Sequence, residues 1–404
     1  MLWLHRVPAF AALTGLFSGC ALIWGIEDLP GDGGVGGGGT AGSTSSSPQT
    51  GGAFGTGAMA GMGGMGAGGT GGAGGSCEAP TVACAAGCVD VTTNAESCGA
   101  CDHDCGDGAA CADGLCSIVE VAVHGGNGAR PNFLTTGGGF LVWALPDRIE
   151  RIATSGGSVE TTLNPAYAAD IVVAEGVSAG KTDVVYSVSA GTVQRIEIDG
   201  TNPRNVGSGY PLPRELATDG DAVYFATHAF DPDASDIMGQ ADANTTPIQI
   251  TARTRQVRGM FAEPGLVFWV EAQTTNGGNG SLMRWTSPNQ FMELATFPNG
   301  SSKPAAVAAN SNFIYVLTED GSLLRRPKSG QADPSLVFST FAGSGEIKTP
   351  DGQQIYWSDG GGAIYRLDDD ANVVKLVATD GHVFAVDATH VYFATDSKIF
   401  RVAR

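Results

Sequence analysis

Two stretches of the chain combine carboxylate, amide and aromatic side chains that suit ligand binding. HAFDPDASD begins at His228, and AQTTNGGNGS begins at Ala272. The residues in and beside them that we expect to contact a ligand are His228, Phe230, Asp231, Asp233, Asp236, Asn276 and Asn279. Loop residues held by a rigid scaffold commonly build recognition sites. The sequence therefore predicts a binding patch here, with neutral variation in loop length as the alternative.

The same residues offer two further kinds of chemistry. Asp231, Asp233 and Asp236 carry carboxylate oxygens of the type that Ca²⁺ prefers, so a calcium site is a secondary hypothesis. His228 is the histidine best suited to a functional role, although a solvated loop histidine is the default interpretation. Apart from calcium, we expect no metal or other cofactor, and we assign no catalytic residue.

The elements that must position these stretches recur seven times after Ser117. A short β-branched and aromatic strand repeats, with Val142, Tyr186, Tyr224, Phe268, Tyr315, Tyr356 and Tyr392 at equivalent positions. These markers are 44, 38, 44, 47, 41 and 36 residues apart. A turn and a second strand follow each marker, and no helical periodicity is sustained. The region is therefore expected to contain only strands and turns.

Four strands in each repeat predict an all-β, seven-bladed β-propeller over residues 117–404. The strand SIVEVAV at Ser117 has no partner in its own repeat, so we expect it to complete the last blade and close the ring. The two long stretches then form hairpins of neighbouring blades. A β-sandwich and propellers of six or eight blades are the alternatives.

The segment Ile355–Asp359 reads IYWSD and resembles the YWTD signature of lipoprotein-receptor propellers. This resemblance implies the general blade pattern and does not imply receptor function. Gly176–Gly180 matches the GxSxG pattern of hydrolases, but that motif needs a turn from a strand into a helix. Here it lies between two predicted strands. An enzyme that assembles distant residues at the propeller axis stays open as an alternative.

Eight of the nine cysteines lie in a short segment, residues 77–116. Because so few residues cannot build a sufficient core, we expect a small module stapled by four disulfides. The cysteines concerned are Cys77, Cys84, Cys88, Cys98, Cys101, Cys105, Cys111 and Cys116. Their pairing stays open, and zinc binding is a weaker alternative because only His103 lies nearby. The run from Gly87 to Cys116 resembles the cysteine-rich repeat of plant stigma-specific proteins, which implies an extracellular disulfide module.

The N-terminus predicts export. Arg6, an apolar run of 11 residues and the small residues before Cys20 are typical of a secretory signal. LFSGC resembles the lipobox of bacterial lipoproteins, which implies a signal peptide at residues 1–19 and lipidation of Cys20. A plain cleaved signal and an anchor helix are the alternatives. Residues 20–76 include 22 glycines in Gly31–Ser76 and are expected to form a disordered tether.

Charge limits the partners. Lys and Arg number 22 against 41 Asp and Glu, a formal charge of −19. Nucleic acid is excluded as a partner because its binding needs a basic surface. We expect an exported protein, attached by its lipid to the outer membrane or cell surface, whose propeller recognises a protein or glycan without catalysis. The alternatives are a lyase or hydrolase with its substrate in the central funnel, and a structural component of the envelope.

Overall fold

The structure is a computed structural model of the 404-residue chain. It describes residues 77–106, 109–124, 130–163, 170–174, 183–189, 191–228, 234–241, 247–272, 279–286, 290–298, 303–329, 332–340, 342–368, 372–378 and 381–404. The expected lipidation site Cys20 and the tether fall outside these residues. Those that are described belong to a single compact unit of the chain.

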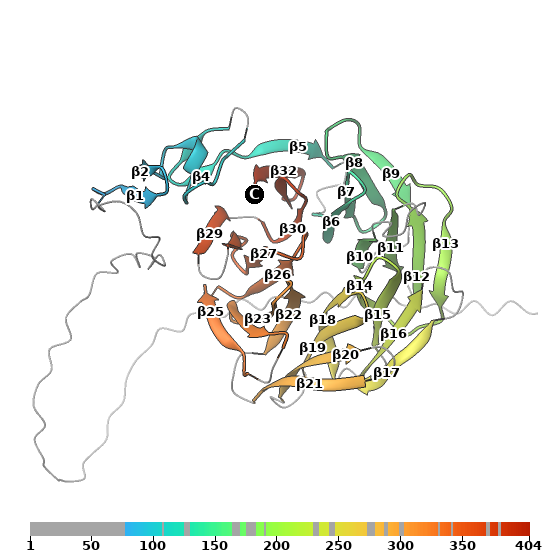
Figure 1. The fold of residues 1–404 in the computed structure, drawn as a ribbon. Helices are drawn as coiled ribbons and strands as arrows, with labels where there is room; N and C mark the ends of the chain where they lie inside the picture. The colour runs from blue at the N-terminus through green and yellow to red at the C-terminus, as the bar shows by residue number, and fades with distance from the viewer. Residues whose placement is uncertain are drawn as a thin grey trace, which may run out of the picture. The chain divides into compact units, whose positions relative to one another are not determined.

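Seven four-stranded antiparallel sheets stand around a central axis (Figure 1). Blade 1 contains β6 (Phe133–Gly137), β7 (Phe140–Ala144), β8 (Ile149–Ala153) and β9 (Glu160–Leu163). Blade 2 contains β10 (Asp170–Ala174), β11 (Val184–Ser189), β12 (Thr192–Glu197) and β13 (Arg204–Ser208). Blade 3 contains β14 (Pro213–Thr218), β15 (Ala222–His228), β16 (Ser235–Ala241) and β17 (Ile248–Thr254). Blade 4 contains β18 (Gln256–Glu263), β19 (Leu266–Ala272), β20 (Gly280–Thr286) and β21 (Gln290–Phe297).

The remaining blades follow the same order. Blade 5 contains β22 (Pro304–Ala309), β23 (Phe313–Thr318), β24 (Ser322–Pro327) and β25 (Ser335–Ser339). Blade 6 contains β26 (Ser344–Lys348), β27 (Ile355–Asp359), β28 (Ile364–Asp368) and β29 (Asn372–Val377). Blade 7 contains β30 (Val383–Val386), β31 (His390–Ala394), β32 (Lys398–Ala403) and, as its outermost strand, β5 (Val119–Val123). The predicted seven-bladed propeller is confirmed.

The ring closes through pairing of the two ends of the propeller sequence. Strand β5 runs antiparallel to β32, with Val119 opposite Arg401 and Val123 opposite Lys398. Blade 7 therefore combines the last three strands of the chain with a strand that precedes blade 1. This pairing satisfies the free edge of β32, as the unpartnered strand at Ser117 predicts.

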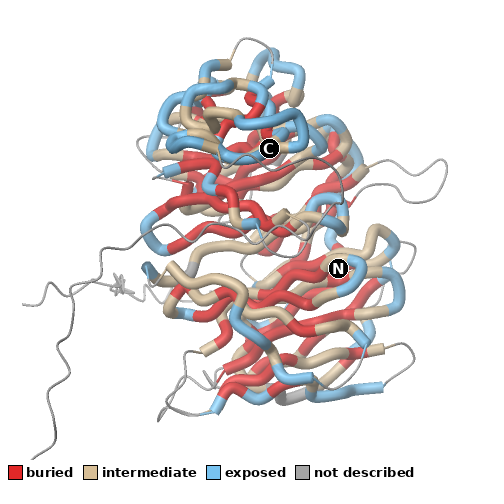
Figure 2. Tube along the Cα trace, turned by 60° about the vertical axis from the view of Figure 1, so that its left-hand side comes forward, coloured by how far each residue is buried: buried red, intermediate tan, exposed pale blue. Residues whose placement is uncertain are grey.

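The core lies between the blades, because the second strand of each blade is buried on both faces. Tyr224 of β15 packs in one cluster with Trp269 of β19, and Tyr315 of β23 packs with Trp357 of β27. Figure 2 shows buried segments along the strands and exposed segments at many of the turns. The apolar markers recur in sequence because each blade repeats the same packing against its neighbours.

Aspartate side chains fix several of the turns. Tyr224 and Tyr392 donate hydrogen bonds of 3.0 and 2.8 Å to Asp219 and Asp387, which follow the innermost strands of their blades. Asp359, the last residue of the IYWSD segment, accepts from the amides of Gly361 and Ala363 at 2.9 Å. The Asp359 carboxylate also accepts from the Tyr365 hydroxyl at 3.1 Å. In this structure Asp359 therefore caps a hairpin within its own blade.

The cysteine-rich module precedes β5. It contains β1 (Thr81–Cys84) paired with β2 (Gly87–Asp90), the one-turn 3-10 helix η1 (Ala95–Ser97), and β3 (Cys111–Ala112) paired with β4 (Leu115–Cys116). The expected disulfides are present, and they join Cys77 to Cys88, Cys84 to Cys101, Cys98 to Cys111, and Cys105 to Cys116. The structure thus supplies the pairing that the sequence leaves open.

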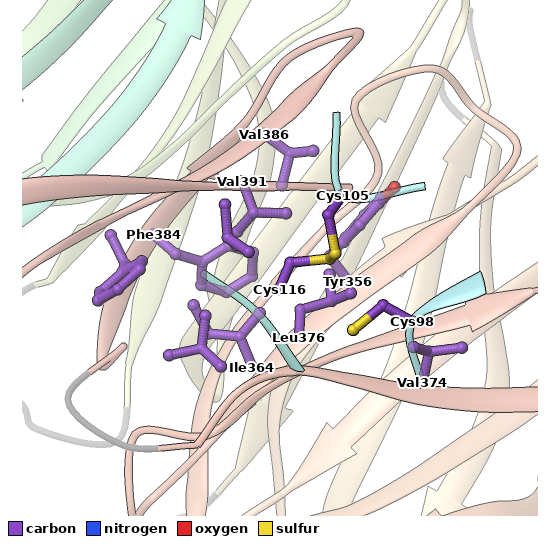
Figure 3. Packing of buried hydrophobic residues seen from close by; sticks show 13 residues of the cluster. Cys98, Cys105, Cys116, Tyr356, Ile364, Val374, Leu376, Phe384, Val386 and Val391 are labelled. Carbon is purple, nitrogen blue, oxygen red and sulfur yellow. A yellow bond between two sulfur atoms is a disulfide. The ribbon is translucent and has the colours of Figure 1, made fainter. Parts of the chain in front are cut away.

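Three of these cysteines belong to a hydrophobic cluster of the propeller. Cys98, Cys105 and Cys116 are at most 5% exposed and pack in one cluster with residues of blades 6 and 7, including Leu376 of β29. Figure 3 shows the Cys105–Cys116 disulfide beside these apolar side chains. The module therefore shares a core with the blades next to the point of ring closure.

The described part of the chain contains no helix with the length and apolar character needed to span a membrane.

Candidate functional site

A cavity of about 960 Å³ lies on the axis of the propeller. Every blade contributes to its wall through its innermost strand or the turn after it. Representative lining residues are Thr135, Val172, Thr218, Met260, Asn310, Lys348 and Asp387. The wall mixes hydroxyl, amide and charged groups with apolar ones, which is the composition of many ligand pockets.

Strand direction places this cavity toward one end of the channel. The innermost strands all run the same way, and the cavity is lined by their last residues and the following turns, such as Ala309–Ser311 and Lys348–Gly352. The first residues of the same strands approach the opposite end. The hairpins β15–β16 and β19–β20, which carry the two long stretches, lie at that opposite end because β15 and β19 run antiparallel to the innermost strands.

Asp170 and Glu215 project from the innermost strands of blades 2 and 3, beyond the cavity toward the hairpin end. Asp170 begins β10, and its carboxylate accepts from the amide of Leu216 at 2.6 Å and from its own neighbour Ile171 at 2.7 Å. Burial raises the pKa of Asp170 to about 7, against the lowering effect of these two amides. The carboxyl therefore titrates near neutral pH, where an ordinary aspartate is fully ionised.

Glu215 occupies a β-bulge of β14. The register with β15 shifts between Arg214 and Leu216. Glu215 has a φ of 52°, in the left-handed region that residues other than glycine seldom adopt. Burial, followed by the negative charge of Asp170, raises the pKa of Glu215 to about 8. Among the described residues, the Glu215 carboxylate has no hydrogen-bond or ion-pair partner.

Both carboxyl groups are surrounded by protein atoms, yet both residues keep part of their solvent exposure. Neither residue lines the cavity itself, but Val172 and Leu216, which follow them on the same two strands, do. In such surroundings two neighbouring carboxylates repel each other strongly, so at neutral pH the pair holds at least part of a proton.

Charged groups from other blades face this pair. Lys348 of β26 donates to the carbonyl of Leu134 at 2.8 Å and lies 3.2 Å from Glu346. The charges of both Lys348 and Glu346 act on Asp170, although blade 6 lies on the other side of the ring from blade 2. The channel thus brings together carboxylates from blades 2, 3 and 6.

The expected binding patch is described only in part. Phe230, Asp231, Asp233 and Asn276 lie outside the described residues, so their role and the calcium hypothesis stay predictions. Asp236 lies in β16, and the Asn279 carbonyl accepts from Arg255 at 3.4 Å.

The default interpretation of His228 as a solvated loop residue is wrong. His228 ends β15 and is 8% exposed, and burial lowers its pKa to about 4. Its Nε2 atom is buried and has no hydrogen-bond partner in the described part of the chain. Strand β15 extends to His228, and the strand is buried on both faces from Val223 to His228, so the imidazole ring is buried with it.

The sequence reasoning missed Asp170 and Glu215. A signal was present, because Asp170 begins the otherwise apolar strand DIVVA and Glu215 lies inside the strand PRELAT. An isolated acidic residue in a strand is ordinary at a sheet edge, however. Only closure of the ring brings blades 2 and 3 to a shared axis.

The described residues also test the zinc alternative for the module. The sulfur atoms of Cys98, Cys105 and Cys116 lie within 4.8 Å of one another. All three belong to disulfides, and a disulfide sulfur is not the thiolate that Zn²⁺ requires. This sulfur group is therefore a pair of adjacent disulfides and not a zinc site.

The module has a recognisable family pattern. Residues 68–119 match the model of the stigma-specific STIG1-like protein family. This match covers the cysteine-rich segment and confirms its expected resemblance, and it identifies a module of extracellular type. No curated protein matches the chain.

Solved structures match the propeller. Virginiamycin B lyase from Staphylococcus aureus is 13% identical with a TM-score of 0.56, over 71% of this chain and 99% of the lyase. A puromycin-hydrolyzing peptidase from Mycobacterium tuberculosis is 14% identical with a TM-score of 0.53, over 68% of this chain and 52% of the peptidase. PorZ, a surface component of the type-IX secretion system of Porphyromonas gingivalis, is 13% identical with a TM-score of 0.52, over 70% of this chain and 37% of PorZ. These likenesses define the class, a β-propeller protein with a STIG1-like module, and extend to the fold alone.

Proposed function

We propose that this protein is an exported recognition protein that binds a protein or glycan segment in the central channel of its propeller. The observation that carries the proposal is the cavity of about 960 Å³ to which all seven blades contribute. A preformed concave site with a few polar groups on a rigid scaffold is the usual setting for ligand binding.

Binding is tested with arrays of glycans and peptides probed by the full chain. Thr135 is half-buried and lines the cavity, so Thr135→Trp fills part of it. Thr161 is exposed on β9, the outermost strand of the same blade, and Thr161→Trp is the matched control. We expect Thr135→Trp to lose array binding and Thr161→Trp to keep it. If both variants bind the array ligands equally well, binding in the cavity is contradicted.

The predicted patch forms a second part of the proposed surface, at the other end of the channel. Shortening both long hairpins is expected to weaken binding to the array ligands, and unchanged binding would remove the patch. Calorimetry with Ca²⁺ tests the proposed use of Asp231, Asp233 and Asp236, and the absence of binding heat would remove that site.

Export and membrane attachment belong to the same proposal. The signal-like N-terminus and the disulfide-rich module support export, and LFSGC supports a lipid on Cys20. In a bacterial host, labelled fatty acid is expected to enter the wild-type chain and not a Cys20→Ser variant. Equal labelling of the two would overturn lipidation at Cys20.

A catalytic role is the second candidate, and the carboxyl pair favours it. Two carboxyl groups with unequal pKa values, here Asp170 and Glu215, can serve as general acid and base in a hydrolase or lyase. Mass spectrometry of array ligands after incubation distinguishes the two roles. Products that disappear in Glu215→Gln would establish catalysis, whereas unchanged ligand supports recognition alone.

A further inference from the structure

The positive charges near Asp170 and Glu215 are largely engaged elsewhere. Lys348 pairs with Glu346 and also bonds the carbonyl of Leu134. Arg258 forms an ion pair with Glu319. Arg214 is exposed to solvent. Neither Asp170 nor Glu215 has an ion-pair partner among the described residues.

An enclosed carboxylate without a counter-charge is costly, and proteins avoid the state by protonation or by binding a cation. Asp170 is partly satisfied, because two backbone amides donate to it. Glu215 has no such donors in the described part of the chain, and its bulge places it directly before Leu216, whose amide donates to Asp170. When it is ionised, the Glu215 carboxylate is therefore a negatively charged hydrogen-bond acceptor that lacks both a donor and a counter-charge.

We propose that Asp170 and Glu215 form a subsite for the ammonium group of a ligand that enters the central channel, such as the end of a lysine side chain in a peptide. This inference rests on the proposed function and names the ligand group that the channel takes. An ammonium group has three donors and one positive charge. It matches the free oxygens of Glu215 together with those of Asp170 that the amides leave available.

The donor set suits an ammonium group better than a metal ion. Ca²⁺ takes six to eight oxygen ligands, and Mg²⁺ demands nearly ideal octahedral geometry. Two carboxyl groups, one of which already accepts two amide hydrogens, supply too few free oxygens for Ca²⁺, and Mg²⁺ would need several additional water ligands to complete its octahedron. A slender alkyl ammonium is also compatible with the apolar part of the wall, which includes Val172, two residues after Asp170, and Leu216, directly after Glu215.

Binding of a cation must be linked to protons. The groups that act on the pair are Lys348 and Glu346 from β26, Arg214 on β14 and Arg258 on β18, together with the mutual repulsion of Asp170 and Glu215. An ammonium group favours the ionised carboxylates and expels the proton that they hold. Affinity is therefore expected to rise with pH while the pair titrates, and lysine itself stays protonated up to about pH 10.

The probe is the peptide Gly-Lys-Gly with blocked ends, and Gly-norleucine-Gly is its neutral control. Calorimetry with the full chain compares the two peptides at about pH 6 and about pH 8.5. We expect the lysine peptide to bind about tenfold or more tightly at the higher pH, because release of one proton changes affinity by up to about tenfold per pH unit. The norleucine peptide should bind weakly and without this dependence.

Two variants test whether the preference for lysine comes from Asp170 and Glu215. Glu215→Gln and Asp170→Asn should each remove most of the preference for lysine and most of the pH dependence. Asp221→Asn, in the turn after β14 at the opposite end of the channel, is the matched control and should change neither. Thermal unfolding of each variant confirms that it is folded. Equal affinity for the two peptides, or a lysine preference that persists in both variants, would overturn the subsite.

The array experiment separates this inference from the proposed function. Ligands that lose binding in Thr135→Trp but keep it in Glu215→Gln would leave channel recognition intact and remove the ammonium subsite. Ligands that are insensitive to Thr135→Trp would contradict channel recognition, whatever the result with the lysine peptide.

Discussion

The carboxylate of Asp170 accepts a 2.6 Å hydrogen bond from the backbone amide of Leu216. This bond joins the innermost strand of blade 2 to that of blade 3, directly after the bulge that holds Glu215. One aspartate thus supports the local backbone and supplies half of the carboxyl pair. Glu215 directly precedes Leu216, so this contact between blades holds the backbone next to Glu215.

Replacement of Asp170 should expose the structural part of its role. Asp170→Ala removes the acceptor of the Leu216 amide and is expected to lower the free energy of unfolding by about 1–3 kcal/mol. Asp170→Asn keeps one acceptor oxygen and should cost less. Urea unfolding at fixed pH measures both. If the two substitutions reduce stability equally, the contact with Leu216 is not the cause.

The carboxyl pair should make stability depend on pH above neutrality. Asp170 and Glu215 have raised pKa values in the folded state, about 7 and about 8, so the folded chain binds more protons than the unfolded one. Their contribution is present at low pH and is lost as pH rises through these values. Unfolding midpoints in guanidinium chloride are therefore expected to fall between about pH 6.5 and about pH 8.5.

Histidines do not account for such a decrease. Burial lowers the pKa of His103 and of His228, so their effect on stability develops below the usual histidine range and has the opposite sign. In Glu215→Gln the fall in stability above neutrality should be much smaller. At the alkaline end of the range, this variant should be more stable than the wild type. If stability falls with pH equally steeply in the wild type and in Glu215→Gln, groups other than this pair cause the fall.

The cysteine-rich module should stabilise the propeller through the Cys105–Cys116 disulfide. Both residues pack in a cluster with strands of blades 6 and 7, and Cys116 lies shortly before the closing strand β5. Replacing both cysteines by alanine should cost about 2–4 kcal/mol and lower the melting temperature of the propeller by a few degrees. Calorimetric scans measure the change.

The Cys77–Cys88 disulfide provides the matched control. It closes a loop with the same sequence separation of 11, but neither cysteine belongs to the cluster shared with the blades. Its replacement by two alanines should leave the propeller transition nearly unchanged. Equal losses from the two double variants would show that packing against the blades contributes little.

Asp359 should act on stability and not on ligand binding. It is 5% exposed, and its carboxylate accepts from two amides and from the Tyr365 hydroxyl. Asp359→Ala leaves these donors unpaired and is expected to cost about 2–3 kcal/mol. Urea unfolding tests the loss, and array binding of the folded variant should match the wild type. Selective loss of binding at unchanged stability would instead indicate a ligand contact.

The sequence was most informative where a pattern repeats. The second strand of every blade is buried on both sides, so its apolar residues recur at regular spacing and reveal seven blades. The unpaired strand after Ser117 likewise predicts closure, because a strand without a partner and the open edge of the last blade can form backbone hydrogen bonds with each other. The eight cysteines of residues 77–116 predict disulfides, but the pairs depend on which sulfur atoms the folded module brings together.

The candidate site was less accessible because its residues are remote in sequence. Asp170, Glu215 and Glu346 belong to three blades and meet only at the axis. Glu215 also needs the bulge in β14, a local departure from strand pairing that the residue types do not specify. The interpretation of His228 failed for a related reason, since β15 extends through it and buries its ring.

By itself, the sequence determined the architecture, since repeated burial on both faces of a strand leaves a periodic record in the residue types. It also determined the presence of a disulfide module, because a short cysteine-rich segment cannot build a core of its own. The tertiary structure alone decided the cavity, the cysteine pairs and the proximity of Asp170 to Glu215. Each of these depends on distances between segments far apart in the chain, which closure of the ring sets.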